Sequence, residues 1–263
     1  MKKSICFGIC TLLTATSYAA DTADLAKQLS NPVANMVSVP FQFNYDEKIG
    51  ANEDIERYQL NIQPVIPISL NEDWNLISRT VLPVVVQTYG DSAKDDDWGT
   101  GDTVQSLFIS PAEPGPGGII WGVGPAMLFP TASEKTLGAD QWGLGPTAVV
   151  LKQIEGWTLG TLVNHIWAVE HKDNAEGVNS TFIQPFVSYT YPSSLTLSLN
   201  TETTYDWNSE DAVVPINMTA TKIVNLNGQL ISIGGGVRYW ADDTTGSAKE
   251  WGGRLIASFI FPK

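Results

Sequence analysis

The sequence is poor in residues on which much extracytoplasmic chemistry depends. Its two cysteines, Cys6 and Cys10, lie within the first 19 residues, and its two histidines are His165 and His171. A mature chain beginning after residue 19 has no cysteine for a disulfide, a catalytic thiol or a thiolate zinc site. The spacing of the histidines matches no helical zinc motif. We therefore expect no cofactor and no metal.

Positive charge and long apolar runs are also scarce. Lys and Arg number 15 against 28 Asp and Glu, and the formal net charge of −13 argues against nucleic acid as a partner. Beyond residue 19 no apolar run is long enough for a transmembrane helix. The mean hydropathy of −0.03 is typical of membrane barrels, in which only alternate residues face lipid.

The amino terminus has the pattern of a secretory signal peptide. Two lysines precede an apolar stretch over 5–15, and Ser17-Tyr18-Ala19 supplies the small residues of a signal-peptidase site. A buried helix is the alternative, but this order of charge, apolar run and small residues favours cleavage. We expect residues 1–19 to be removed during export.

Twelve segments of strand length follow residue 36, each close to the about 9–11 residues that a tilted membrane strand requires. They are 37–46, 57–69, 73–88, 102–110, 118–129, 142–152, 156–169, 178–190, 194–206, 212–223, 228–240 and 250–261. Short turns alternate with longer polar loops between them, as in outer-membrane barrels. This predicts an all-β fold, a single antiparallel up-and-down transmembrane β-barrel of about 12 strands over 37–263, with short periplasmic turns and long outer loops.

Residues 20–36 precede the first of these segments. Leu25 and Leu29 share one side of a short amphipathic turn or helix, which Asn31-Pro32 ends. We expect this segment to be a short helix or a plug that enters the barrel.

Apolar and polar residues alternate within several segments. In 194–206, leucines at odd positions share one face, and Asn200 and Glu202 share the other. If the apolar faces meet lipid, the lumen and solute path are lined by Asn61, Gln63, Arg79, Asn200, Glu202 and Arg238. We expect Arg79, Glu202 and Arg238 to orient a passing solute. The alternative reverses the faces and gives a soluble periplasmic β-protein.

Two features mark irregular places in the strands. Prolines within the segments each remove a hydrogen-bond donor from the ladder and indicate bulges, bends or interruptions; they are Pro64, Pro67, Pro83, Pro125, Pro146, Pro185 and Pro215. The pentapeptide Trp121–Pro125 recurs as Trp142–Pro146 with alternate glycines. We expect those glycines to allow a close approach of neighbouring chain.

Acidic residues are concentrated in the expected outer loops. Asp95, Asp96 and Asp97 either form part of a solvated, repulsive surface or bind a divalent cation that bridges to lipopolysaccharide phosphates. Their spacing does not match an EF-hand. The expected partners are outer-membrane lipid and lipopolysaccharide, a small-molecule solute, and the barrel-assembly machinery during biogenesis.

Six stretches of the chain resemble the bacterial MetA-pathway phenol-degradation family, whose members are often named transporters. They are Leu29–Asn35, Tyr58–Pro67, Asp73–Thr80, Gly145–Gln153, Val163–Trp167 and Asn200–Trp207, and the similarity extends over about 25–263. The resemblance implies an outer-membrane barrel related to channels for small, often aromatic or apolar, compounds.

These observations favour a passive outer-membrane channel for small solutes. Two alternatives remain: a non-conducting structural or interaction barrel, and a barrel enzyme that acts on lipid or peptide. The His-x-Ser pair by which barrel lipases resemble one another is missing, since Ile166-Trp167 follows His165 and Lys172-Asp173 follows His171. We therefore expect no catalytic residues.

Overall fold

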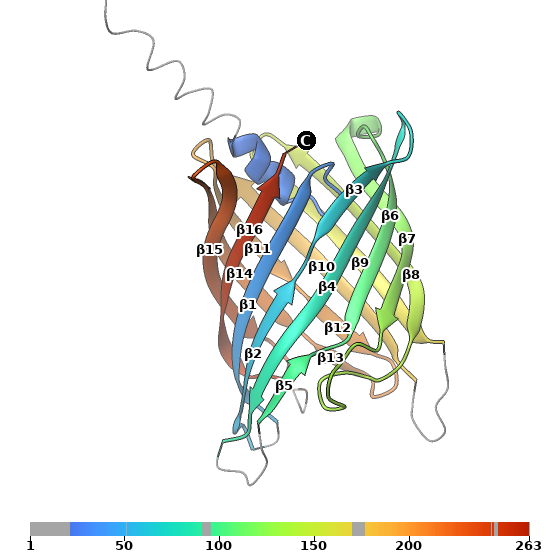
Figure 1. Cartoon of the computed structure of the whole chain (residues 1–263), viewed down its shortest axis with the longest axis vertical. Coiled ribbons are helices and arrows are strands. Elements are labelled where there is room, and N and C mark those ends of the chain that lie inside the picture. Colours follow the sequence, from blue (N-terminus) through green and yellow to red (C-terminus); the bar gives the residue numbers. More distant parts are fainter. Residues whose placement is uncertain are drawn as a thin grey trace, which may run out of the picture.

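The computed structural model describes residues 22–50, 52–90, 96–169, 177–242, 244 and 247–262. In these residues one antiparallel sheet curls until its first and last strands, β1 and β16, pair from Val37↔Phe261 to Tyr45↔Gly253 (Figure 1). The result is a closed barrel of 12 strands, so the predicted fold class is confirmed. The predicted signal peptide over 1–19 lies outside the described residues.

The wall contains 16 strand segments because four of its strands are each interrupted once. The interrupted strands are β2/β3, β5/β6, β11/β12 and β13/β14. The segments are β1 (Val37–Ile49), β2 (Ile55–Ile62), β3 (Val65–Ser69), β4 (Trp74–Thr88), β5 (Asp97–Thr100), β6 (Thr103–Pro111), β7 (Ile119–Phe129), β8 (Gly143–Ile154), β9 (Trp157–Ala168), β10 (Asn179–Thr190), β11 (Leu195–Thr201), β12 (Thr203–Asp206), β13 (Asp211–Val213), β14 (Pro215–Leu226), β15 (Gln229–Trp240) and β16 (Glu250–Phe261), with a single 3-10 turn, η1 (Pro116–Gly118).

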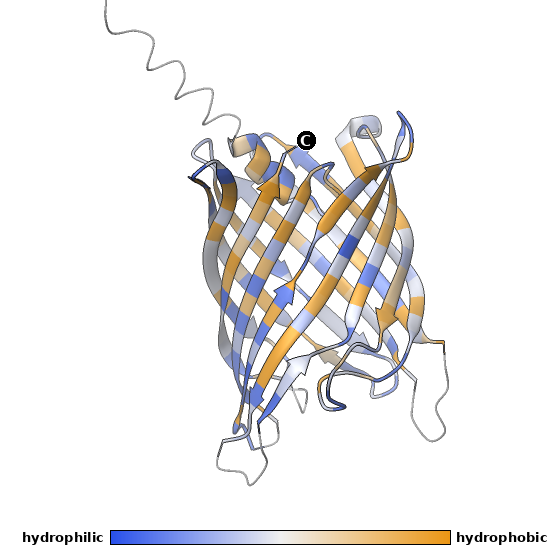
Figure 2. Cartoon of the chain, in the orientation of Figure 1, coloured by the Kyte–Doolittle hydropathy of each residue, from blue (hydrophilic) through white to orange (hydrophobic). Residues whose placement is uncertain are grey.

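The outer face of the barrel is apolar and the inner face is largely polar, as the alternation along the strands predicts. Leu197, Leu199 and Leu255 are 43–63% exposed on the outside, while Asn44 and Asn217 are 1% exposed on the inside. Figure 2 shows the resulting mixture of orange and blue along each strand. A soluble barrel would have the opposite arrangement, so these faces are those of a membrane-spanning barrel.

Aromatic pairs mark the two rims of this apolar band. Trp74–Trp121 and Trp157–Tyr189, with ring centroids 6.0 and 4.9 Å apart, lie beside the tight turns, since Trp74 begins β4 and Trp157 begins β9. The carboxyl terminus lies at the same end of the barrel (Figure 1). Tyr239–Trp251, at 5.0 Å, lies toward the opposite end. Such girdles place amphipathic rings at the two membrane–water interfaces.

Four of the prolines within the predicted strands coincide with defects in the ladder, whereas Pro67 on β3 is regularly paired with Ile77 on β4. Pro125 of β7 and Pro146 of β8 face each other as register partners. At a non-hydrogen-bonded pair of an antiparallel ladder, the backbone N–H groups of the two residues point away from each other. The donors that these two prolines lack would therefore have faced β6 and β9, the strands on either side. The pairing of β7 with β6, and of β8 with β9, lapses at these two positions. Pro64 and Pro215 instead adjoin strand interruptions.

The chain before β1 folds inside one end of the barrel. Residues 22–29 form a helix, and Val33 beyond it is 5% exposed in a core with inward side chains of Ile77, Phe108 and Leu162. The amide of Gln153 on β8 donates a hydrogen bond to the carbonyl oxygen of Lys27 at 2.8 Å. No helix among the described residues is long and apolar enough to span a membrane.

Candidate functional site

The predicted site residues face the lumen, because alternate residues along the wall point inward. Arg79 lies on β4, Asn200 on β11 and Arg238 on β15, whereas Gln63 and Glu202 occupy the breaks between β2 and β3 and between β11 and β12. A cavity of about 250 Å³ is bordered by Gln63, Arg79, Asn200 and Glu202. Asn61, on β2, accepts a hydrogen bond from Gln59 at 2.8 Å, and Arg238 is nearly buried in the wall.

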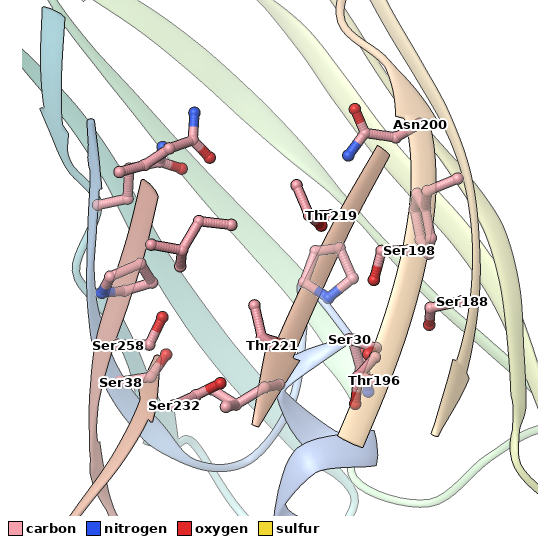
Figure 3. A pocket seen from close by; sticks show the side chains of 18 of the residues that line it. Ser30, Ser38, Ser188, Thr196, Ser198, Asn200, Thr219, Thr221, Ser232 and Ser258 are labelled. Carbon is pink, nitrogen blue, oxygen red and sulfur yellow. The ribbon is translucent and has the colours of Figure 1, made fainter. Parts of the chain in front are cut away.

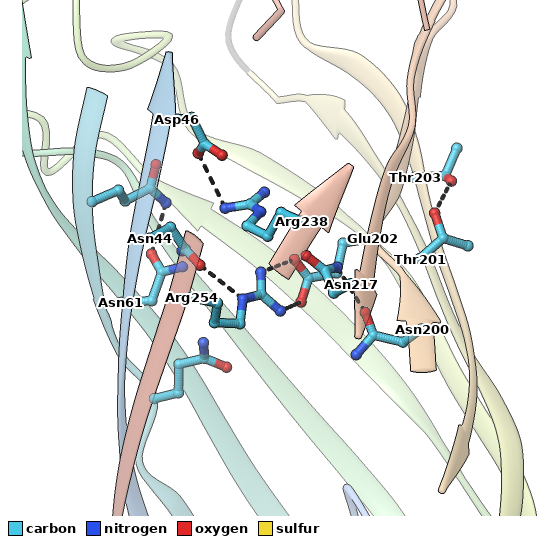
Figure 4. Close-up of polar contacts among 12 residues, drawn as sticks. Asn44, Asp46, Asn61, Asn200, Thr201, Glu202, Thr203, Asn217, Arg238 and Arg254 are labelled. Atoms are coloured by element: carbon cyan, nitrogen blue, oxygen red, sulfur yellow. Dashed lines mark hydrogen bonds and ion pairs between the residues drawn. The ribbon is translucent and has the colours of Figure 1, made fainter. Parts of the chain in front are cut away.

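Glu202 is held by an arginine that the sequence reasoning did not name. Arg254 on β16 donates to both carboxylate oxygens of Glu202, from Nη1 at 2.9 Å and from Nη2 at 2.7 Å (Figure 4). Its Nε donates to Asn44 Oδ1 at 2.8 Å. The Arg254 side chain is 2% exposed and that of Glu202 is 21% exposed. This bidentate pair therefore fixes Glu202 across the lumen.

A second buried pair lies nearer the outer end. Arg238 Nη1 donates to Asp46 Oδ2 at 3.1 Å, and both side chains are less than a tenth exposed (Figure 4). Trp240 Nε1 donates to the other oxygen of Asp46 at 3.0 Å, and its ring lies 5.0 Å from the Arg238 guanidinium. Both oxygens of Asp46 are thus bonded in a nearly dry environment, which is how a protein retains a buried charge.

Two further lumen arginines bind amides instead of carboxylates. Arg57 donates to Gln87 Oε1 from Nε at 3.1 Å and from Nη2 at 2.9 Å. Arg79 Nη2 donates to Gln63 Oε1 at 3.1 Å. We call the six charged side chains the charged belt: Asp46, Arg57, Arg79, Glu202, Arg238 and Arg254. Its four arginines and two carboxylates leave two positive charges in excess, in a chain whose formal net charge is −13.

Hydroxyl groups dominate the cavity on the side of the tight turns. Ser188, Thr196, Ser198, Thr219 and Thr221 come from three adjacent strands and point into it (Figure 3). Ala26, Leu29 and Ala34 of the segment before β1 cover part of the same cavity with apolar side chains. The site therefore combines a charged end, hydroxyl walls and an apolar cover formed by the amino-terminal segment.

Four inward residues were missed by the sequence reasoning: Asn44, Asp46, Arg57 and Arg254. Each lies within or beside a predicted strand and obeys the same alternation that identified Arg79. On β1, Phe41, Phe43 and Tyr45 face outward and alternate with the inward residues. The same alternation of apolar and polar residues therefore predicts that Asn44 and Asp46 face the lumen.

Of the remaining candidate residues, His165 lies on the outer face of β9, whereas Asp97 shares the inner face with its register partner Gln87. His165 packs against Trp167 with ring centroids 4.0 Å apart, and its Nδ1 is 2.7 Å from Thr181 Oγ1. His171 and Asp95 are outside the described residues. Asp97 accepts a hydrogen bond from the Tyr89 hydroxyl. Among the described residues no group of three or more His, Cys, Asp or Glu is placed to hold a metal ion.

Comparisons with known proteins identify the class of fold. No protein-family model and no curated protein matches the chain. The barrel is similar to an outer membrane channel from Pseudomonas putida F1, with a TM-score of 0.67 and 15% identity over 86% of this chain and 96% of that one. Outer membrane phospholipase A from Escherichia coli gives a TM-score of 0.48 at 13% identity over 93% and 98% of the two chains. A KdgM porin gives 0.46 at 9% identity over 85% and 99%.

The fold is therefore that of outer-membrane β-barrels. At these identities the comparisons establish shared architecture, and the two with TM-scores below 0.5 carry no further argument.

Proposed function

We propose that this protein is an outer-membrane channel through which small solutes diffuse passively. The observation that carries the proposal is the polar cavity inside a closed barrel, bordered by Arg79, Glu202 and Arg254 of the charged belt and by hydroxyl side chains. A barrel that served only as a membrane anchor would gain more stability from an apolar, fully packed interior than from buried charges. Solvated, mixed-charge walls are instead the means by which channels select solutes.

The volume of the cavity is suited to small solutes only. Its volume of about 250 Å³ is below the roughly 300–1,000 Å³ of pockets that accept drug-sized ligands. A barrel of 12 strands lies between those filled by side chains and the wide porins. The family resemblance extends the proposal to aromatic or apolar compounds such as phenol, which remains a prediction.

The amino-terminal segment supports a plugged channel. Residues 22–36 place Val33 in one inward core and Ala26, Ala34 and Met36 in another, against Ile223 and Ile260. These contacts occupy the end of the lumen that carries the tight turns. We propose that the segment narrows the path there and that it moves or is bypassed when a solute passes.

Planar-bilayer conductance of the refolded mature protein tests the proposal. Discrete, salt-dependent steps are expected, and Arg79→Ala and Glu202→Ala should change the conductance or the ion preference because both residues border the cavity. The matched control is Lys222→Ala, since Lys222 is exposed on the outer face of β14. Phenol uptake into liposomes tests the narrower expectation.

A non-conducting structural barrel is the second candidate, because the two apolar cores fill part of the lumen. The same recordings separate it from the channel. If neither the mature protein nor a variant lacking residues 22–36 conducts, the channel proposal is wrong and the structural barrel is favoured.

A further inference from the structure

Arg79 differs from the other arginines of the charged belt in how few of its donors are bonded. A guanidinium has five N–H donors, and among the described residues a single hydrogen bond, from Nη2 to Gln63 Oε1, involves this side chain. Arg254 by contrast makes three such bonds to Asn44 and Glu202. No nitrogen of Arg79 is among the buried polar atoms without a partner, so its remaining donors are accessible from the cavity that it borders.

No carboxylate of the described chain neutralises Arg79 by direct contact. Glu202 borders the same cavity, but both of its oxygens are taken by Arg254. No ion pair within 4.0 Å joins Arg79 to an acidic side chain in the described part of the chain. A guanidinium without a carboxylate in direct contact, held in a low-dielectric wall, attracts anions more strongly than the same group in water.

The shape of the donor group narrows the class of anion. A planar guanidinium presents two parallel N–H groups that match the two oxygens of a carboxylate, as Arg254 already does with Glu202. The rest of the cavity offers hydroxyl walls, with Thr196, Ser198 and Thr219 among them, and the apolar cover of Leu29 and Ala34 (Figure 3). These surroundings suit a small, uncharged remainder of the solute.

We propose that the lumen cavity contains a subsite for a small organic carboxylate, bound by the Arg79 guanidinium. The inference rests on the proposed channel function and specifies its substrate class: the channel admits small organic acids in their ionised form. Arg79 is the residue that binds the carboxylate, and Gln63 holds its guanidinium in place through the bond at 3.1 Å.

Calorimetric titration of the mature protein in detergent tests the subsite without requiring conduction. Benzoate is the probe, and benzyl alcohol is its neutral match in size and shape. We expect benzoate to bind at least about tenfold more tightly, because a charge-assisted bidentate contact is absent with the alcohol. Arg79→Gln should remove this difference, and Arg79→Lys should keep part of it, because lysine retains the charge without the fork.

Two further variants keep the test decisive. Gln63→Glu leaves Arg79 in place but sets a carboxylate beside its Nη2. This carboxylate should form an ion pair with the guanidinium and so abolish benzoate binding. Lys222→Gln removes a positive charge from the exposed outer face and should leave binding unchanged. Heat-modifiable migration on a gel confirms that each variant is folded.

The outcomes distinguish this inference from the proposed function. Equal affinities for benzoate and benzyl alcohol, or unchanged benzoate binding in Arg79→Gln and Gln63→Glu, would overturn the carboxylate subsite while leaving a channel for neutral solutes intact. Benzoate binding that depends on Arg79, in a protein that never conducts, would instead support the subsite and contradict the channel.

Discussion

Individual residues of the charged belt differ in whether they stabilise the barrel or remain available to a solute. Arg254 and Glu202 satisfy each other with two hydrogen bonds, as Arg238 and Asp46 do with one, and each pair links strands that are not neighbours in the sheet. These paired charges chiefly stabilise the closed barrel, because removing one partner would leave the other buried and unpaired. Arg79 and Arg57 have amide partners, and among the described residues neither is in direct contact with a carboxylate. Substitutions in the two groups should therefore have different consequences.

Glu202→Gln should destabilise the folded barrel. The change leaves the Arg254 guanidinium buried at 2% exposure without a counter-charge. The expected loss is toward the lower end of about 3–5 kcal/mol, because Glu202 itself is 21% exposed. Urea unfolding in detergent, followed by tryptophan fluorescence, measures the change. The double variant Glu202→Gln/Arg254→Gln should recover part of the loss, and no recovery would contradict the role given to the orphaned charge.

Gly145→Ala should destabilise the wall by steric overlap. A Cβ at Gly145 would lie 1.7 Å from the carbonyl oxygen of His165, which explains why this position of the repeated pentapeptide is glycine. The expected cost is about 1–3 kcal/mol, the usual range for overpacking. Gly253→Ala is the control, since a Cβ there meets no atom within 4 Å. Equal heat-modifiability midpoints for the two variants would show that the wall relaxes.

At the scale of whole elements, the amino-terminal segment is the part of the structure whose removal should change transport most. Deleting residues 22–36 takes Val33 out of the core that contains Ile77, Phe108 and Leu162 and uncovers the cavity. The expected result is a larger single-channel conductance. Val33→Asp should act in the same direction, because a carboxylate is poorly tolerated among these apolar side chains.

An unchanged conductance would contradict the role given to the amino-terminal segment. If the deletion and Val33→Asp both leave the conductance unchanged in protein that is folded by gel mobility, the segment does not narrow the path. Val33→Ala provides the matched control, since it keeps an apolar residue at this position and should leave the segment seated.

Strand locations were predictable from the sequence, and the prolines indicated the interruptions beside Pro64 and Pro215. The interruptions between β5 and β6 and between β11 and β12 contain no proline and were not predicted. All 12 predicted segments correspond to strands of the wall, because period-two alternation and turn residues are local signals. The segment expected at 102–110 begins earlier, with β5 at Asp97, since a short break separates β5 from β6. Such breaks depend on the register of the neighbouring strand, which a single sequence does not encode locally.

The same limit applies to the site. Alternation was enough to place Arg79 and Glu202 on the inner face, because it depends only on nearby residues. It could not pair Glu202 with Arg254, 52 positions away, or Asp46 with Arg238, 192 positions away. Closure of the barrel brings Asp46 on β1 near Arg238, because β16 pairs with both β1 and β15. Glu202 and Arg254 meet across β14 and β15, which lie between their strands in the curved sheet.

The whole barrel is surrounded by an apolar outer band. A charge introduced in the middle of this band should lower the free energy of unfolding more than a charge introduced at its edge. Leu255 lies halfway along β16 and is 63% exposed, whereas Leu226 ends β14 beside a tight turn and is 55% exposed. Leu255→Arg should cost about 2–4 kcal/mol and Leu226→Arg about 0–1 kcal/mol. Urea titration of protein folded in liposomes measures both; equal costs would contradict the assignment of the lipid-facing band.

The amino-terminal segment can also be regarded as a ligand tethered to its own receptor. It is joined directly to β1, so its concentration at the lumen is set by the length of the connection and not by the amount of protein in the membrane. For a short tether this effective concentration is about millimolar or higher. A solute that needs the space of the segment must compete with this effective concentration, however dilute the protein is. A solute small enough for the free cavity does not have to displace the segment. In the proposed channel, the tether would therefore select solutes by size, independently of any selection by the charged side chains.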